Sequence, residues 1–506
     1  MSKRKNVLVI LCDQLRPDFL PVYGCQALPC PSIDSLANRG KVFDRAITCC
    51  PVCAPARAAM MTGHYPSRSG VWTNDIPFNE GLEFLPERMK RLGYKTACFG
   101  KLHHCPPTDT KGFEHARLLE ERRLGQEEPY WQWLKKQLPE EPDFNNFGQF
   151  DRKDLVFNLD DDLHMDNWVA SETVSYINDT SADDSLFMWV SFQGPHDPLN
   201  PPKSAKGTVD TSLLPKPLQR IEGELCPIHH YRSTWHPVPD TVEGIMKERT
   251  AYAERTVNID RQIGRILHAL EEQGILEETT ILFSADHGDL RGDFNLKEKG
   301  PFAYSGQLNI PLIVANHPQF APGTRSDILA NNIDIPATVL EIAGDEDPVI
   351  GMSRSLVNAD QTDTWRTYNF VEVADTMRIV ETEQFRFATY PFINFNELFD
   401  RIDDPCEQYN LAGRPEYREV EMKLMQRVHD FALLNKGLEI GGFDLIPEVQ
   451  DCIRELEPHF DRPGRFKAAF PLMPSAKKNL KQAGIEPYTN WYKDHKILAH
   501  YGLDFT

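Results

Sequence analysis

The sequence is short of positive charge, and this deficit excludes one class of partner. It carries 55 lysine and arginine residues against 75 aspartate and glutamate residues, a formal net charge of −20 over 506 residues. Nucleic-acid binding needs a basic surface that neutralises phosphates, so we expect no nucleic-acid partner. The same acidity repels anions at long range, so an anionic substrate must be captured by a local cluster of cationic side chains.

Long apolar runs are also missing. No segment approaches the roughly 20 apolar residues that cross a bilayer, so we expect no membrane association. The basic N-terminus leads into an apolar run at residues 7–11, which is too short for a secretion signal and stops at Asp13. The 11 cysteines, an odd number, favour reduced thiols over a disulfide framework. These features together predict a cytoplasmic protein.

Short, near-continuous apolar runs alternate with helical patterns along much of the chain. The runs cover residues 7–11, 97–99, 186–192, 281–284 and 310–315, and such runs are typical of parallel strands that are buried on both faces. The clearest helical pattern covers residues 255–274, with one apolar face and Gly274 as its stop. Strands that alternate with helices predict a doubly wound α/β sheet.

Polar side chains follow the first four of these runs directly. In chain order they are Asp13, Lys101 with His103, His196, and Asp286 with His287. Open α/β sheets bind ligands at the carboxyl ends of their strands, so we expect these groups to meet there. The sequence therefore predicts one site that is assembled from several strand ends.

The pattern changes after about residue 366. Residues 368–373, 377–381 and 385–390 have the pattern of short antiparallel strands, and a helix is predicted from Pro415 to Gly437. We therefore divide the chain into an α/β domain at residues 1–366, a smaller α+β domain at 367–440 and a tail extension at 441–506. The tail is expected to cover the main domain or a neighbouring subunit, which makes a homo-oligomer an expectation.

Residues 53–63 contain the most informative local pattern, C-A-P-A-R at 53–57 with Thr62-Gly63 downstream. Pro55 and the alanines around it predict the first turn of a short helix that ends at Gly63. Cys53 would then lie at the helix N-terminus, where free N–H groups favour negative charge, and Arg57 would follow on the same face. A nucleophile and a guanidinium directed at one anion suit attack on a sulfate or phosphate ester.

This pattern resembles the maturation signature of the type I sulfatases, a family of the alkaline phosphatase superfamily in which the cysteine is oxidised to formylglycine. Further segments resemble the family's motifs in the same order, across most of residues 5–412. They are G-K-L-H at 100–103, G-P-H-D-P at 194–198, K-G-P at 299–301 with Tyr304 and Gly306, and E-L-F-D at 397–400 with N-L-A at 410–412. The related phosphonate monoester hydrolases share this resemblance.

The resemblance implies an alkaline-phosphatase-like fold, with a mixed, mostly parallel sheet and a smaller C-terminal α+β domain. It implies one divalent cation, with calcium first and manganese or magnesium as alternatives. The implied ligands are Asp13, matured Cys53, Asp286 and His287. The family often has Asp-Asp at residues 13–14 and Asp-Asn at 286–287, whereas this chain has Asp-Gln and Asp-His.

The implied reaction is hydrolysis of a sulfate monoester through a covalent sulfo-enzyme. Arg57, Lys101 and Lys299 help the cation to neutralise the sulfate oxygens, and the formylglycine hydrate at residue 53 is the nucleophile. His196, with Lys299, donates a proton to the leaving oxygen, and His103 takes one from the remaining hydroxyl to release sulfate. The implied partners are a small-molecule sulfate ester and a formylglycine-generating or equivalent maturation enzyme.

Three alternatives stay open at this stage. A phosphonate monoester hydrolase or phosphodiesterase on the same scaffold would show the same nucleophile, and some such enzymes share Asp-Gln and Asp-His. A relative of the phosphoglycerate mutases or alkaline phosphatases would use Ser or Thr and usually two metals, which Cys53 disfavours. A redox dithiol or zinc module would pair Cys50 and Cys53 with ligands such as the segment at residues 103–105.

Overall fold

A large mixed sheet forms the centre of the protein in the computed structural model, which describes residues 6–435 apart from 144, 145, 147, 148, 182, 230–236 and 363. The sheet has eight strands in the order β11-β2-β10-β9-β1-β8-β4-β5. The strands are β1 (Asn6–Asp13), β2 (Gly40–Phe43), β4 (Lys95–Gly100), β5 (His115–Leu118), β8 (Leu186–Pro195), β9 (Thr279–Ala285), β10 (Leu312–Ala315) and β11 (Thr324–Ser326). The predicted mixed, mostly parallel sheet is confirmed, because β10 alone among these strands runs against its neighbours.

One strand direction differs from the prediction. The apolar run at residues 310–315 predicts a parallel strand, whereas β10 pairs with β9 and β2 antiparallel, with Leu312 opposite Ser284. An antiparallel strand inside a sheet is covered on both faces just as a parallel one is, so a continuous apolar run does not distinguish the two. The direction of residues 310–315 was therefore wrongly predicted, although their strand character was correct.

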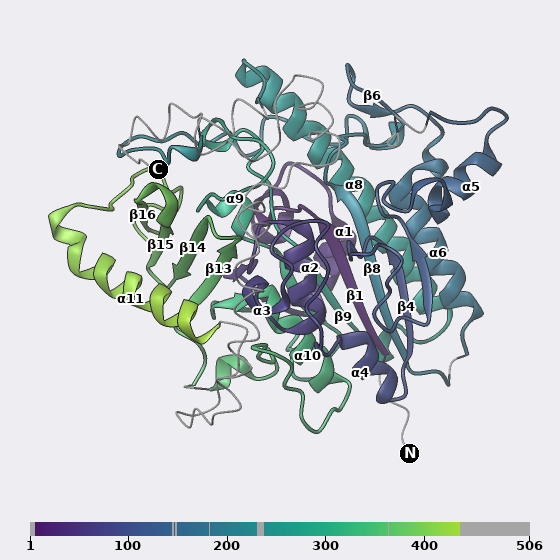
Figure 1. Ribbon diagram of the computed structural model, residues 1–506. Coiled ribbons are helices and arrows are strands. Elements are labelled where there is room, and N and C mark those ends of the chain that lie inside the picture. The colour runs from purple at the N-terminus through teal and green to yellow at the C-terminus, as the bar shows by residue number, and fades with distance from the viewer. Residues whose placement is uncertain are drawn as a thin grey trace.

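Helices cover both faces of the sheet (Figure 1). On one side α1 (Pro31–Asn38) and α6 (Met165–Asp179) both contact α8 (Val242–Glu272). On the other side α2 (Cys53–Thr62) contacts α4 (Leu85–Arg91) and α10 (Ile335–Ile342). The described part of this region also contains the α-helices α3 (Pro66–Ser69), α5 (Pro129–Gln137) and α9 (Ser305–Leu308). Every residue of β1 is buried, as expected for a strand between two helical layers.

The sequence pattern underestimated the longest helix. α8 starts at Val242, well before the predicted residue 255, with the side chain of Thr241 capping its first turn. The predicted stop is confirmed, since Gly274 follows the helix in the left-handed region at φ +69°. The early turns of α8 were missed because their apolar residues are too sparse to mark a continuous stripe.

A second, antiparallel sheet follows the first. Its strands are β13 (Asn369–Val373), β14 (Met377–Glu381), β15 (Phe385–Tyr390) and β16 (Phe395–Asp400), in sequence order. α11 (Arg418–Leu434) packs against β14 and β15 after a 3-10 turn that begins at Pro415. The predicted strands are confirmed, and β16 is an additional strand formed by the E-L-F-D motif. The division at residue 366 stays a prediction, and Gly437 and the tail at 441–506 lie outside the described residues.

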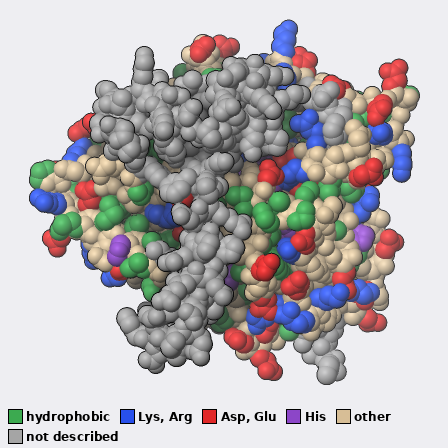
Figure 2. Space-filling view, viewed as in Figure 1, with side chains coloured by type: hydrophobic (Ala, Val, Ile, Leu, Met, Phe, Trp, Pro, Cys, Tyr) green, Lys and Arg blue, Asp and Glu red, His purple; other side chains and the backbone are tan. Residues whose placement is uncertain are grey.

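Two strand pairs complete the description, β3 (Ala46–Ile47) with β12 (Ala330–Asn331) and β6 (Phe150–Asp151) with β7 (Val156–Phe157). On the face in Figure 2, lysine and arginine side chains are interspersed with acidic ones in the part that described residues form. Within the described residues no helix has the length and apolar character needed to span a bilayer.

Candidate active site

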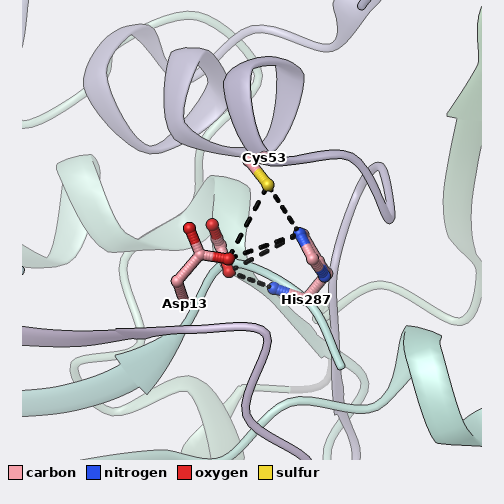
Figure 3. A group of neighbouring side chains, drawn as sticks. Asp13, Cys53 and His287 are labelled. Atoms are coloured by element: carbon pink, nitrogen blue, oxygen red, sulfur yellow. Dashed lines mark hydrogen bonds and ion pairs between the residues drawn. The ribbon is translucent and has the colours of Figure 1, made fainter. Parts of the chain in front are cut away.

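The carboxyl ends of β1 and β9 and the start of α2 converge on one buried group of side chains (Figure 3). Asp13 is the last residue of β1, and Asp286 and His287 directly follow β9. Cys53 is the first residue of α2, whose predicted end at Gly63 is confirmed with φ +66°. The strand-end argument predicted that Asp13, Asp286 and His287 lie close together, and the structure places them so.

The four side chains of this metal-capable group are in mutual reach. One ligand atom from each of Asp13, Cys53, Asp286 and His287 lies within 4.8 Å of the others. The Cys53 Sγ is 3.2 Å from His287 Nε2 and 3.7 Å from Asp13 Oδ1. All four residues are buried, so the carboxylates need cationic neighbours.

Each carboxylate divides its two oxygens between the group and the cations behind it. Asp13 Oδ1 faces Cys53 and His287, while Asp13 Oδ2 forms an ion pair with Lys101 Nζ at 2.6 Å and accepts from Arg57 Nη2 at 3.3 Å. Asp286 Oδ1 lies 3.8 Å from His287 Nε2, while Asp286 Oδ2 accepts from Arg57 Nε at 2.8 Å. The Oδ1 atoms are therefore oriented toward the centre of the group.

Arg57 is committed to protein acceptors. Besides the two aspartates, its Nη1 donates to the backbone oxygen of Lys101 and, at 2.8 Å, to Ser191 Oγ. These contacts use four of the five N–H groups of a guanidinium. Arg57 is 1% exposed, so its main contacts are with the two aspartates rather than with solvent.

His287 presents a free lone pair to the group. Its Nδ1 lies 2.8 Å from the backbone oxygen of Gly288, and because a carbonyl only accepts, Nδ1 carries the proton. Burial lowers the pKa of His287, with Asp286 opposing the shift and Lys299 adding to it. A neutral imidazole with Nε2 unprotonated is the form that ligates a metal ion.

The charges around Asp13 keep it ionised. Burial would raise the pKa of Asp13, but Lys101, His196 and Arg57 outweigh burial and hold the pKa well below its ordinary value. Burial would likewise lower the pKa of Lys101, but Asp13 and Glu121 raise it. The anionic carboxylate and the cationic ammonium are therefore both stable in a site that excludes water.

Lys299 and His196 form a second pair beside Cys53. Lys299 Nζ lies 2.7 Å from His196 Nε2 and also donates to Gln14 Oε1. A contact this short between two basic nitrogens holds a single proton between them. Burial would lower the pKa of Lys299, but charge at Cys53 raises it, which is consistent with a position close to the thiol.

Comparison with known proteins identifies the family. The sequence profile of the family described as Sulfatase matches residues 5–345, two thirds of the chain. The chain belongs to the sulfatase family. A second profile, described as N-sulphoglucosamine sulphohydrolase, C-terminal, matches residues 292–433 of this sulfatase. The predicted sulfatase membership is thereby confirmed, and the chain is an enzyme that hydrolyses sulfate esters.

Individual relatives cover most of this sulfatase. An arylsulfatase of Clostridium perfringens is 27% identical over 451 residues, which cover 82% of this chain and 92% of the relative. A choline-sulfatase of Rhizobium meliloti is 26% identical over 447 residues, with coverages of 81% and 83%. The solved phosphonate monoester hydrolase of Silicibacter pomeroyi has the same fold, with a TM-score of 0.77, 21% identity and coverages of 87% and 97%.

His103 is the predicted site residue that the sulfatase structure connects least to the others. It adopts a left-handed backbone, φ 62°, and its N–H donates to Glu120 Oε1 at 3.1 Å. Its Nδ1 is buried and has no hydrogen-bond partner. The role of His103 as a base stays a prediction, although an unpartnered nitrogen leaves it free to accept a proton.

Sequence reasoning missed two carboxylates that hold the end of β4. Glu120 accepts from the N–H groups of Leu102 and His103, and burial raises its pKa to about 8. Glu121 pairs with Lys101 at 2.9 Å and lies 3.7 Å from His196 Nδ1. They follow β5, a strand too short to mark in the sequence, and the run E-E-R-R at 120–123 has no resemblance to a motif.

The zinc or redox alternative finds no support in the described part of the chain. The metal-capable group there joins Cys53 to Asp13, Asp286 and His287, and not to Cys50 or His104. Burial raises the pKa of the Cys50 thiol, which disfavours the thiolate that redox chemistry needs. Gln14 contacts the group through its backbone, since its N–H donates to Asp286 Oδ1 at 2.9 Å, while its side-chain amide contacts Lys299 and Asp289.

Proposed function

We propose that this sulfatase cleaves sulfate monoesters with a formylglycine hydrate formed from Cys53, beside one bound divalent cation. The observation that carries the proposal is the position of the thiol, 3.2 Å from the free Nε2 of His287 and 3.7 Å from Asp13 Oδ1. A side chain of residue 53 that carries two hydroxyls would reach the same ligand atoms.

The donors fit a hard divalent cation. Two inward carboxylate oxygens, one neutral imidazole nitrogen and the side chain at residue 53 supply mixed oxygen and nitrogen ligands, and they are buried together. Asp13, Asp286, His287 and residue 53 would hold the ion, with calcium first and manganese or magnesium next. When bound, such an ion acts as a Lewis acid toward sulfate oxygens and lowers the pKa of a nearby hydroxyl.

Cationic side chains prepare the site for an anion that the acidic protein would otherwise repel. Arg57 orients both carboxylates through their Oδ2 atoms, and Lys101 places a positive charge beside Asp13. Together with Lys299, which lies beside His196, these groups compensate the charge that develops on the sulfate oxygens. We infer that Arg57 acts mainly by holding the carboxylates, because they occupy two of its donors.

Proton transfer is assigned to two groups. The Lys299 and His196 pair holds a proton between Nζ and Nε2, and it donates to the alkoxide or phenoxide as the ester bond breaks. The sulfate is then covalently attached to one oxygen of residue 53. His103 takes the proton of the remaining hydroxyl, so the aldehyde reforms and sulfate leaves.

The remaining expectations concern the substrate, the maturation enzyme, the cellular location and the oligomeric state. A small-molecule sulfate ester suits a site that is buried and lined by single charged groups. A maturation enzyme is needed because the aldehyde arises by oxidation of Cys53. A cytoplasmic location and a homo-oligomer stay predictions.

Two measurements test the proposal. The mass of the peptide that contains residue 53 should show sulfur and two hydrogens replaced by oxygen in active protein. Cys53→Ala should abolish turnover of an aryl sulfate, because the side chain can no longer carry an oxygen nucleophile. Fully active protein that retains an unmodified thiol would contradict the mechanism.

A phosphonate monoester or phosphodiester hydrolase is the second candidate. The pairs Asp13-Gln14 and Asp286-His287 favour it, since some such enzymes share them. One preparation assayed with an aryl sulfate and a phenylphosphonate monoester decides between the two. We expect the sulfate ester to have the higher kcat/KM, and the reverse order would assign the site to phosphonates.

A further inference from the structure

The C-terminal antiparallel sheet and the loop after it hold the turn at residues 299–309 through hydrogen bonds to Ser305. Glu407, in the loop after β16, accepts from the Ser305 N–H through Oε2 and from the Ser305 hydroxyl through Oε1, both at 2.7 Å. Arg386 on β15 donates to the same hydroxyl at 3.0 Å and to the backbone oxygen of Ala303 at 3.3 Å. Arg386 and Glu407 also pair with each other, and both are buried.

The turn at residues 299–309 is hydrogen-bonded to Gly288 and Asp289, which directly follow Asp286 and His287. The N–H of Gly288 donates to Gln307 O at 2.9 Å, and the N–H of Asp289 donates to Gly306 O at 2.8 Å. A Cβ at Gly288 would lie 2.1 Å from Gly306 O, so the two turns touch backbone to backbone. Asp286 and His287 immediately precede this contact, and its position therefore sets theirs.

The same turn holds Lys299. Gln307 accepts from the N–H of Gly300 through Oε1 and donates through Nε2 to the Gly300 oxygen, both at 2.9 Å. These paired bonds fix the peptide next to Lys299. The turn at residues 299–309 therefore connects the proton-donating pair and the ligand segment to one anchor in the second sheet.

Three further observations support a specific attachment of the turn at residues 299–309 to the second sheet. Apolar residues of the turn, Phe302, Tyr304 and Leu308, share one buried cluster with residues of the second sheet such as Ile379. Glu407 itself has a left-handed backbone, φ 56°, which costs energy for a residue with a side chain and is retained where surrounding contacts require it. The C-terminal family profile spans residues 292–433, which includes both the turn and the sheet.

We propose that Arg386 and Glu407 are positioning residues, through which the C-terminal sheet sets the geometry of Lys299, Asp286 and His287. The inference rests on the proposed function for the roles of those three residues. The second sheet then completes the active site without contacting the substrate. We call the contacts of Arg386 and Glu407 with the turn at Ser305 the clamp. Its removal should weaken cation binding and turnover more than it weakens substrate binding, because the substrate's own contacts remain.

The test compares variants of the full chain. Glu407→Ala removes both Glu407 contacts to Ser305 while Arg386 keeps its own, Glu407→Gln keeps one acceptor oxygen for Ser305, and Ser305→Ala removes only the hydroxyl contacts. Arg401→Met is the matched control, because Arg401, which directly follows β16, pairs with Glu381, the other partner of Arg386, and does not contact Ser305 in the described structure. Each protein is stripped with a chelator, titrated with Ca²⁺ or Mn²⁺ by calorimetry, and assayed for kcat, KM and thermal unfolding.

We expect Glu407→Ala to lose about 10-fold or more in cation affinity and in kcat, with KM nearly unchanged. Glu407→Gln should recover part of both losses, and Ser305→Ala should show smaller losses of the same kind. Arg401→Met should keep the wild-type affinity while its unfolding temperature falls. Should Glu407→Ala fail to fold, Ser305→Ala carries the same comparison.

Two results would overturn the clamp. The first is wild-type cation affinity and kcat in folded Glu407→Ala or Ser305→Ala. The second is a loss of affinity and kcat in Arg401→Met as large as that in Glu407→Ala, because it would indicate general destabilisation. Failure of the proposed function is separately visible. The calorimetric titration requires no sulfate ester, whereas inactive wild-type protein, or wild-type protein that binds neither cation, contradicts the proposed site before any variant is compared.

Discussion

Arg57→Lys tests how the two aspartates are held. Arg57 donates to Asp286 Oδ2 at 2.8 Å through Nε and to Asp13 Oδ2 at 3.3 Å through Nη2, two nitrogens of one planar group. A lysine ammonium is a single point on a flexible chain and reaches at most one of these oxygens. The variant therefore keeps the charge but loses the orientation of one carboxylate.

The size of the effect follows from the bond that is lost. A hydrogen bond between charged groups contributes about 1.5–3 kcal/mol. If that energy orients a metal ligand, its loss should lower cation affinity by about 10- to 100-fold. Since Lys101 still neutralises Asp13, we expect the larger disturbance at Asp286, whose Oδ2 has Arg57 as its cationic partner.

The assay is a competition titration of the metal-free protein with a chromophoric chelator. Arg249→Lys is the matched control, because Arg249 is also buried and pairs with Asp293, away from Asp13 and Asp286. It should lose stability without losing cation affinity. Wild-type affinity in a folded Arg57→Lys protein would refute the idea that the guanidinium orients the carboxylates.

Three further predictions concern protonation, packing and pH. Lys299→Met should lower kcat more for alkyl sulfates than for nitrophenyl sulfate, because a poor leaving group depends more on the proton from the Lys299 and His196 pair; an equal loss on both substrates would exclude this role. Gly288→Ala should lower both cation affinity and the unfolding temperature, since its Cβ would meet Gly306 O at 2.1 Å, and wild-type values would show that the two turns can separate. Asp260 on α8 has its pKa raised by burial to about 6, so its folded state holds a proton that the unfolded chain releases near pH 4. Stability should therefore fall by about 2 kcal/mol as pH rises from 4 to 6. Asp260→Asn should remove this dependence in urea unfolding at the two pH values, and an unchanged slope would assign it to other groups.

The apolar runs predicted the sheet centre and the meeting of Asp13, Asp286 and His287, whereas only the family resemblance joined Cys53 to them. The reason is physical, because strands buried on both faces leave continuous apolar runs, and the first polar residue after each run marks the binding edge. The start of α2 was also predictable, since Pro55 and Gly63 each have a defined place in a helix.

Other features were out of reach because they depend on tertiary contacts. The direction of β10 depends on how it pairs with its neighbouring strands, and its apolar residues would be the same in a parallel or an antiparallel strand. Glu120 and Glu121 belong to an ordinary charge run until β5 places them beside Lys101. The grip of Glu407 on Ser305 joins residues that are 102 positions apart, which no local pattern records.

The burial of Cys53 limits when another protein can reach its thiol. With 1% of its surface exposed at the base of α2, the thiol is out of reach of any other protein once the chain has folded. Under the proposed mechanism, the enzyme that oxidises this residue must therefore meet it before the chain folds. On that mechanism, a host cell that supplies the enzyme too late would accumulate folded molecules that can no longer be activated.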